Sequence, residues 1–264
     1  MRNKSGLIAC VWAILLGLTP LHAAETKPPV FNEVGVVERI GATLDLSVEL
    51  VNESGTRVPL KSFFSDPNVP VIIAPMYYSC PMLCQLIADG LVAGISESKL
   101  ELGRDFKVLS VSIDPEDTPK SASQFRDKYT GKLGEAHIKA EWHFLTGDSK
   151  SMHTLTDQLG FYYKPDDQGE IAHQAAIMVV TPQGKIVRYL YGIDYKPRTL
   201  SFALKEAKVG KGQATIDQLI LYCYKYDPTS RSYTLQAKNI MRLGGILTVL
   251  FIAFVIFGLK VKKK

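Results

Sequence analysis

Two cysteines separated by three residues are the feature of this sequence best suited to chemistry. Cys80 and Cys84 lie in the segment Tyr77-Tyr78-Ser79-Cys80-Pro81-Met82-Leu83-Cys84. At positions i and i+4 of a first helical turn, both sulfur atoms can face the same side. Such a dithiol can exchange disulfide bonds or bind a soft metal ion.

These thiols are expected where a buried strand meets a helix. The apolar, β-branched run 69–74 predicts the strand, and residues 85–92 predict a helix with an apolar face. Ser79 is expected to cap that helix, and Pro81 suits its first turn. Because backbone N–H groups and the helix dipole lower thiol pKa values at such a junction, we expect reactive thiolates there.

The order of the other predicted elements is typical of one fold. A strand pair is predicted within 36–50, with a turn at 52–55, and a second buried strand is predicted at 107–113. Then follow a helix capped by Thr118, a short strand at 142–147, a helix from Ser149, a hairpin of 175–181 with 185–191, and a last helix at 197–208. This order predicts an α/β, thioredoxin-like fold with an N-terminal hairpin extension, in which the cysteines occupy a strand-to-helix turn.

His173 is the third candidate ligand, because it lies just before the predicted strand 175–181. In a thioredoxin-like fold, the loop before that strand lies against the cysteine turn. Two thiolates and one imidazole suit copper, since thiolates favour Cu(I) and imidazole tolerates Cu(II). Zinc competes, although structural zinc usually takes four protein ligands and three are counted here. A lone histidine at this place is equally compatible with a surface or core role.

Other residues of suitable chemistry are expected to be structural. Met76 and Met82 are soft donors beside the cysteines that we expect to pack in the core or make surface contacts. Asp114 is expected to form a turn before Pro115, and Cys223 to be a buried thiol between tyrosines. Three histidines show no metal-ligand spacing with one another and are interpreted as structural or solvated: His137, His143 and His153.

Both ends of the sequence predict export and anchoring. Residues 1–24 are typical of a secretory signal peptide, with Arg2 and Lys4 before an apolar run and small residues at Ala23 and Ala24. Residues 243–259 form an uncharged apolar run of 17 residues, the short end of a spanning helix, and lysines follow it. We expect a signal peptide at 1–24, a thioredoxin-like copper-binding domain at 25–236, a C-terminal transmembrane helix at 240–259 and a basic cytoplasmic tail at 260–264. The domain would face the periplasm, with the helix as a single-pass anchor in the inner membrane.

Composition narrows the function classes. The net charge of +5 includes six positive charges near the two ends, and residues 25–259 hold 25 basic and 26 acidic residues. Nothing in this balance indicates nucleic-acid binding. After loss of Cys10 with the signal peptide, three cysteines would remain, too few for a disulfide scaffold. A pair of cysteines close together in the sequence of an exported protein therefore indicates a redox or metal-binding role and not a structural one.

Together these residues resemble the SCO/SenC family, the copper chaperones of cytochrome c oxidase assembly. The resemblance covers roughly residues 30–210 and lies in 80–84, 110–119, 142–147, His173 and 181–185. Residues 221–228 followed by an anchor look like a longer subgroup. The resemblance implies copper as cofactor, bound by Cys80, Cys84 and His173, and its delivery to, or thiol reduction at, the dinuclear copper site of the oxidase. The implied partners are the copper-site subunit of the oxidase, and another periplasmic copper carrier or a thiol reductant.

Two function classes remain open from the sequence. The first is a metallochaperone, which binds and transfers a metal ion and catalyses no reaction. The second is a membrane-anchored periplasmic thiol-disulfide oxidoreductase without copper transfer, in which Cys80 attacks, Cys84 resolves and His173 need not matter. A peroxidase fits less well, because no Thr-x-x-Cys turn with an arginine partner is present. One departure from the family is visible: many members have an acidic residue immediately before the histidine, and this chain has Ala172.

Overall fold

The computed structural model describes residues 34–133, 141–165, 170–208, 224–227 and 232–235, together with Met241, Gly245 and Thr248. Across these residues, no helix is both long and apolar enough to span a membrane. Several predictions fall outside the described residues and stay predictions: the signal peptide, all of the apolar run 243–259 except Gly245 and Thr248, the lysine tail, His137 and Cys223.

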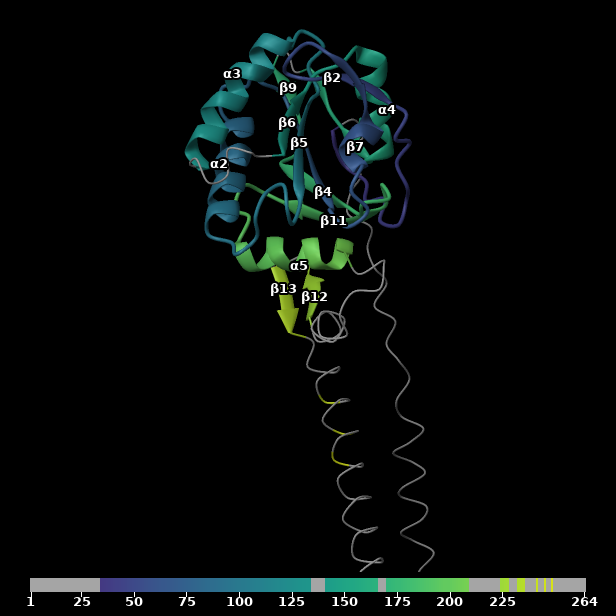
Figure 1. The fold of residues 1–264 in the computed structure, drawn as a ribbon, viewed down its shortest axis with the longest axis vertical. Helices are drawn as coiled ribbons and strands as arrows, with labels where there is room; N and C mark the ends of the chain where they lie inside the picture. Colours follow the sequence, from purple (N-terminus) through teal and green to yellow (C-terminus); the bar gives the residue numbers. More distant parts are fainter. Residues whose placement is uncertain are drawn as a thin grey trace, which may run out of the picture. The chain divides into compact units, whose positions relative to one another are not determined.

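A five-stranded sheet forms the centre of the fold, in the order β11-β10-β4-β5-β6 (Figure 1). Strands β4, β5 and β6 run parallel to one another, whereas β10 is antiparallel to both β4 and β11. Every residue of β4 and β5 is buried, as expected for parallel strands covered on both faces. The strand bounds are β4 Val71–Met76, β5 Lys107–Ser112, β6 Trp142–Leu145, β10 Ala176–Val180 and β11 Ile186–Tyr191.

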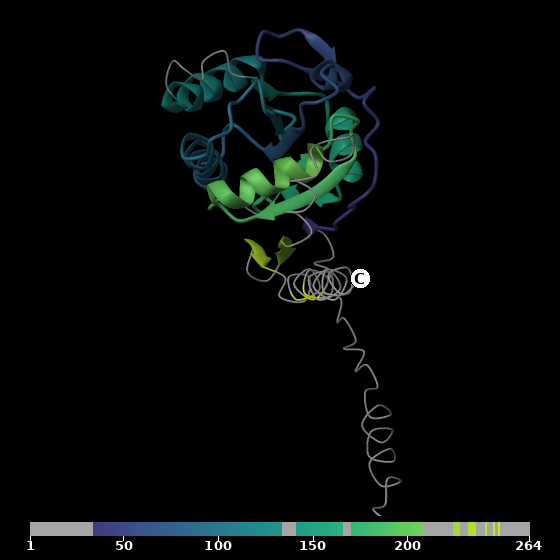
Figure 2. The ribbon, with the colours of Figure 1, turned by 60° about the horizontal axis from the view of Figure 1, so that its bottom comes forward.

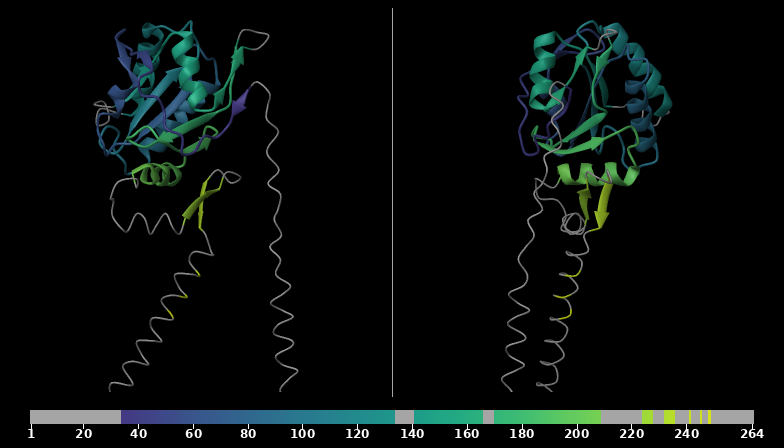
Figure 3. Two further views of the ribbon diagram at one scale, coloured as in Figure 1. Left: turned by 90° about the vertical axis from the view of Figure 1, so that its right-hand side faces the viewer. Right: turned by 180° about the vertical axis from the view of Figure 1, so that it is seen from behind.

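Helices cover both faces of this sheet. Helix α2 (Leu83–Ser96) connects β4 to β5, and α3 (Pro119–Thr130) connects β5 to β6. Because both right-handed crossovers step in the same direction along the sheet, both helices lie on one face. The chain then steps back from β6 to β10, which places α4 (Ser149–Gln158) on the other face (Figures 2 and 3). Helix α5 (Pro197–Lys208) packs against β10 and β11. The predicted thioredoxin-like α/β fold is confirmed, with β6 as an added parallel strand.

The N-terminal extension contains a hairpin around the predicted turn at 52–55, but its strands differ from the prediction. The expected strand pair within 36–50 is wrong: β1 (Gly35–Val36) pairs with β7 (Phe161–Tyr162), and β2 (Glu49–Val51) pairs with β3 (Arg57–Pro59). The Asn52 side chain accepts from the N–H groups of Ser54 and Thr56 and closes the β2–β3 turn. The residues between β1 and β2 lie along the β10–β11 hairpin, where Leu44 N–H donates to Gly184 O. These backbone groups therefore pair with a distant turn instead of with each other.

Smaller elements complete the described structure. Thr118 caps α3 as predicted, and its hydroxyl accepts from the Ser121 N–H. The short elements are η1 Leu60–Phe64, η2 Gly131–Leu133, the pair β8 Lys164–Pro165 with β9 Ile171–Ala172, and the pair β12 Tyr224–Asp227 with β13 Ser232–Leu235.

Candidate metal centre

The two cysteines lie in the turn between β4 and α2, as predicted. Cys80 is 4% exposed and Cys84 is fully buried, and neither forms a disulfide. The prediction that Ser79 caps α2 is wrong, because the helix begins at Leu83 and its N-cap is Met82, whose side chain makes no cap bond. Instead, Cys80 Sγ accepts from the Cys84 N–H at 3.3 Å and takes over the role of a capping oxygen.

His173 reaches the same turn from the segment after β9. Its Nε2 lies 3.4 Å from Cys84 Sγ, and its Nδ1 lies 3.2 Å from the carbonyl oxygen of Gln174. A carbonyl can only accept, so Nδ1 carries the proton of the neutral ring. The lone pair of Nε2 therefore faces the thiols, which is the tautomer that a metal ligand needs. The structure thus brings all three predicted ligands together.

The two thiols have opposite ionisation behaviour. The hydrogen bond from the Cys84 thiol, the contact with His173 and the N–H groups of Cys84 and Met82 outweigh burial and lower the pKa of Cys80 to about 3. The hydrogen bond with the Cys80 thiolate, together with burial, raises the pKa of Cys84 far above its usual value. Because the pair shares its protons, the first proton leaves Cys80 and the second stays on Cys84. The reduced dithiol is therefore a thiolate at Cys80 and a thiol at Cys84.

Tyr77 borders the three groups. It is 5% exposed, its ring stands edge-on to that of His173 with centroids 5.9 Å apart, and its hydroxyl donates to Glu170 Oε2 at 2.7 Å. Burial and hydrogen bonds with Glu170 and Cys80 raise the pKa of Tyr77, so the phenol keeps its proton. Sequence reasoning missed Glu170 entirely, since it lies three positions before His173 and no motif marks it.

Asp117 supports the turn from the β5 side. Its Oδ2 accepts from the Tyr78 N–H at 2.7 Å and from Ser112 Oγ at 2.6 Å, while Oδ1 accepts from Ser121 Oγ at 3.0 Å. Burial raises the pKa of Asp117 despite these donors. The motif 110–119 therefore does more than mark the fold: it supplies the carboxylate that holds the backbone two residues before Cys80.

No metal cage is preformed among the residues that the structure describes. Within the described ranges, no group of three or more His, Cys, Asp or Glu side chains is already spaced to hold an ion. Cys84 Sγ and His173 Nε2 instead lie in direct contact at 3.4 Å, so a metal ion would have to enter between them and displace the Cys84 proton. The donor set fits a soft metal: two sulfurs and one nitrogen converge, and one of the sulfurs is already a thiolate.

The residues predicted to be structural are mostly confirmed. Met76 is fully buried, whereas Met82 is 66% exposed. Asp114 forms the expected turn, since its Oδ1 accepts from the Glu116 N–H at 2.9 Å. His153 stacks on Tyr163, and His143 lies 3.1 Å from Glu141 and 3.8 Å from Glu53, away from the cysteines.

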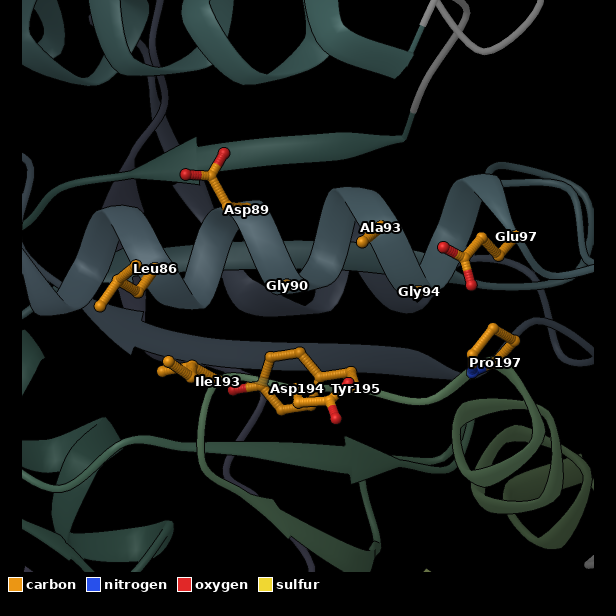
Figure 4. A pocket seen from close by; sticks show the side chains of 10 residues that line it. All are labelled: Leu86, Asp89, Gly90, Ala93, Gly94, Glu97, Ile193, Asp194, Tyr195 and Pro197. Carbon is orange, nitrogen blue, oxygen red and sulfur yellow. The ribbon is translucent and has the colours of Figure 1, made fainter.

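A shallow cavity of about 360 Å³ lies along α2 and contains neither cysteine (Figure 4). Its floor is formed by Gly90 and Gly94, against which the segment 193–195 lies. A Cβ at Gly94 would stand 2.4 Å from Tyr195 O, so the absence of a side chain permits this contact. The glycines thereby fix where α2, and with it Cys84, lies relative to β11.

The SCO1/SenC family model matches residues 39–207. The chain belongs to the SCO1/SenC family. It is 26% identical over 153 residues to the SCO1 protein homolog of Bacillus subtilis (strain 168), which covers 55% of this chain and 72% of the relative. Arabidopsis thaliana ScoI, solved with copper bound, shares 21% identity at a TM-score of 0.51 over 64% of this chain and 99% of its own. BsSco is described with a disulfide switch and as a member of the Sco family of cytochrome c oxidase assembly proteins. It shares 19% sequence identity at a TM-score of 0.52, over 67% of this chain and 99% of its own. At these identities the two structures show a shared fold.

Proposed function

We propose that this member of the SCO1/SenC family is a copper-binding metallochaperone of cytochrome c oxidase assembly, with Cys80, Cys84 and His173 as the copper ligands. The observation that carries the proposal is the convergence of the two thiols and the unprotonated Nε2 of His173, which lies 3.4 Å from Cys84 Sγ. Family membership and the copper bound to Arabidopsis ScoI support the same assignment.

The residues fit both oxidation states of copper. The two sulfurs suit Cu(I), and His173 adds the nitrogen donor that Cu(II) prefers. Cys80 is ready as a thiolate, whereas Cys84 must release its proton when it becomes a ligand. Copper binding therefore releases one proton from this pair. Because Cys80 is 4% exposed and Cys84 fully buried, the site limits access of water and larger oxidants to the thiols.

The finer role is delivery of copper to the dinuclear copper site of the oxidase, with its copper-site subunit as acceptor. The description of BsSco as an oxidase assembly protein supports this role. Another periplasmic copper carrier would supply the metal, or a thiol reductant would keep the dithiol reduced.

The test is metal analysis of the reduced full chain, with His173→Ala as the variant. We expect one copper per chain, preference for copper over zinc, and a sulfur-to-copper charge-transfer band in the Cu(II) form. His173→Ala should weaken Cu(II) binding chiefly, whereas His153→Ala, which removes a histidine stacked on Tyr163, should change neither oxidation state. Zinc preference, or two coppers per chain, would contradict the proposal.

A thiol-disulfide oxidoreductase is the second candidate, favoured by the low pKa of Cys80. The Cys80 thiolate would attack a substrate disulfide and release one substrate thiol. Cys84, after losing its proton, would attack the mixed disulfide, so that the substrate leaves reduced and Cys80–Cys84 becomes the disulfide. A thiol reductant would restore the pair. Full oxidase assembly by His173→Ala at limiting copper would favour this candidate over the chaperone.

The proposed location is the inner membrane, with the cysteine domain on the periplasmic side. The support comes from the sequence of residues 1–24 and 240–264, which lie almost wholly outside the described residues. A reporter fused after Lys264 should be active only if it is of a type that works in the cytoplasm. Activity of a periplasmic reporter at that position would contradict the anchor.

A further inference from the structure

Tyr77 contacts both halves of the candidate copper site. On the cysteine side, its backbone N–H donates to Cys84 Sγ at 3.4 Å. On the histidine side, its hydroxyl donates to Glu170 Oε2 at 2.7 Å, and its ring edge packs on His173. The hydroxyl bond joins residues 93 positions apart in the sequence, and so connects two segments of the chain that meet only in the folded protein.

The segment that carries His173 has little secondary structure of its own. It follows β9, whose ladder with β8 consists of two residue pairs, Lys164 with Ala172 and Pro165 with Ile171. Neither strand belongs to the five-stranded sheet, and both residues of β8 are exposed. A two-stranded ladder of this length is marginal by itself. On its other side the segment is fixed only from Ala176, where β10 begins, so the position of the imidazole also depends on side-chain contacts from outside the segment.

We propose that Tyr77 is a positioning residue for His173: its hydroxyl bond to Glu170 holds the segment 170–173 against the cysteine turn. A hydrogen bond to a carboxylate is stronger than one between neutral groups, and a nearly buried phenol needs such a partner. Glu170 lies three residues before His173, so fixing its side chain also restricts the imidazole. The inference rests on the proposed copper site for its metal readouts, but not for its structural ones.

A matched control exists in the same chain. The Tyr191 hydroxyl donates to Glu38 Oε1 at 2.8 Å, the same chemistry at a site that contacts none of the three candidate ligands. Tyr77→Phe and Tyr191→Phe each remove one hydroxyl from one tyrosine–glutamate bond and keep the ring. Glu170→Gln keeps an amide oxygen as acceptor and should be milder than Tyr77→Phe.

The first measurement needs no copper. In the reduced full chain, hydrogen–deuterium exchange of peptides covering 170–175 should become about tenfold faster in Tyr77→Phe and less so in Glu170→Gln. Peptides from α4 serve as the internal reference for global opening. In Tyr191→Phe the exchange of 170–175 should equal that of the wild type. Equal exchange in Tyr77→Phe and Tyr191→Phe would overturn the positioning role.

The second measurement uses copper alone. Release of Cu(II) to a chelator should be about tenfold faster in Tyr77→Phe, which corresponds to about 1.4 kcal/mol, and its electron paramagnetic resonance spectrum should show a weakened nitrogen ligand. Retention of Cu(I), which the two sulfurs dominate, should change less than about twofold. If the wild type binds no copper while the exchange difference persists, the proposed function fails and the positioning role stands. If the wild type binds copper through nitrogen and Tyr77→Phe behaves as Tyr191→Phe in both measurements, the positioning role fails and the proposed function stands.

Discussion

Replacing Asp117 with alanine should destabilise the reduced protein by about 2 kcal/mol and loosen the backbone before the cysteines. The carboxylate accepts hydrogen bonds from the Tyr78 N–H, Ser112 Oγ and Ser121 Oγ. It therefore connects the end of β4 to the end of β5 and to the start of α3. Because Tyr78 lies two residues before Cys80, this connection also sets the geometry of the cysteine turn.

The magnitude depends on which donors find another acceptor. Ser112 Oγ already lies 3.2 Å from Asp114 O, and Ser121 Oγ lies 2.9 Å from Thr118 O, so each hydroxyl has a second partner. The N–H of buried Tyr78 has none that the structure shows, and an unpaired buried donor costs about 1–3 kcal/mol. Weakening of the two hydroxyl bonds adds little, because each hydroxyl keeps its second acceptor. The net loss is about 2 kcal/mol.

Urea unfolding of the reduced full chain measures this loss, and alkylation of the cysteines by iodoacetamide measures the loosening. Asp117→Asn keeps an acceptor for the Tyr78 N–H and should lose about half as much. Asp114→Ala is the control, because its partners Ser79 and Glu116 are exposed and can bond to water. The reasoning is refuted if Asp117→Ala is as stable as Asp114→Ala. It is also refuted if Asp117→Asn lowers the free energy of unfolding as much as Asp117→Ala does.

Three further outcomes are expected. Gly94→Ala should lower the urea midpoint, because a Cβ 2.4 Å from Tyr195 O outweighs the gain of about 1 kcal/mol in helix propensity, whereas Gly131→Ala, with nothing within 4 Å, should not. Burial opposes the charging of His143, but its ion pair with Glu53 and its hydrogen bond with Glu141 raise its pKa. This stabilisation is present below the unfolded pKa of about 6.5 and is lost as pH rises through the folded value. The cost of His143→Gln in unfolding free energy should therefore shrink as pH rises above about 6.5, and an unchanged cost would contradict the ion pairing. Cys80→Ser should abolish both copper binding and disulfide formation, measured by metal analysis and thiol titration; retained copper would place the site elsewhere.

The cysteine turn and the sheet could be predicted because their signals are local. Apolar runs such as 69–74 mark buried strands wherever they occur, and Thr118 with Pro119 marks a helix start. His173 followed from topology: in this order of elements, the segment before β10 has to approach the turn after β4, since the two strands are neighbours. Local sequence patterns and the order of the strands were therefore sufficient to predict the three candidate ligands.

Two local predictions failed where a distant partner competed with the local one. Ser79 is a good capping residue, but its hydroxyl donates to Asp114 Oδ2 at 3.4 Å, 35 residues away. The chain continues through Pro81 in a turn before α2 begins, and the Cys80 sulfur occupies the cap. The run 36–50 alternates like a strand pair, yet its backbone bonds to Gly184 and its neighbours in the β10–β11 hairpin. Propensity describes what a segment can do alone, and here tertiary hydrogen bonds decide the outcome.

The polar groups around the ligands could not have been found from the sequence at all. Asp117 reaches Tyr78 across 39 residues and Glu170 reaches Tyr77 across 93, and neither distance follows from periodicity or from topology. Ala172 stands where the family resemblance leads us to expect a carboxylate, so the sequence by itself indicates that an orienting group is missing. In the fold, a carboxylate two residues earlier meets a phenol from the cysteine side of the site. Because the phenol also packs on His173, a missing acidic residue in a motif does not establish that the imidazole lacks support; the support can come from the opposite segment, and only the side-chain contacts show it.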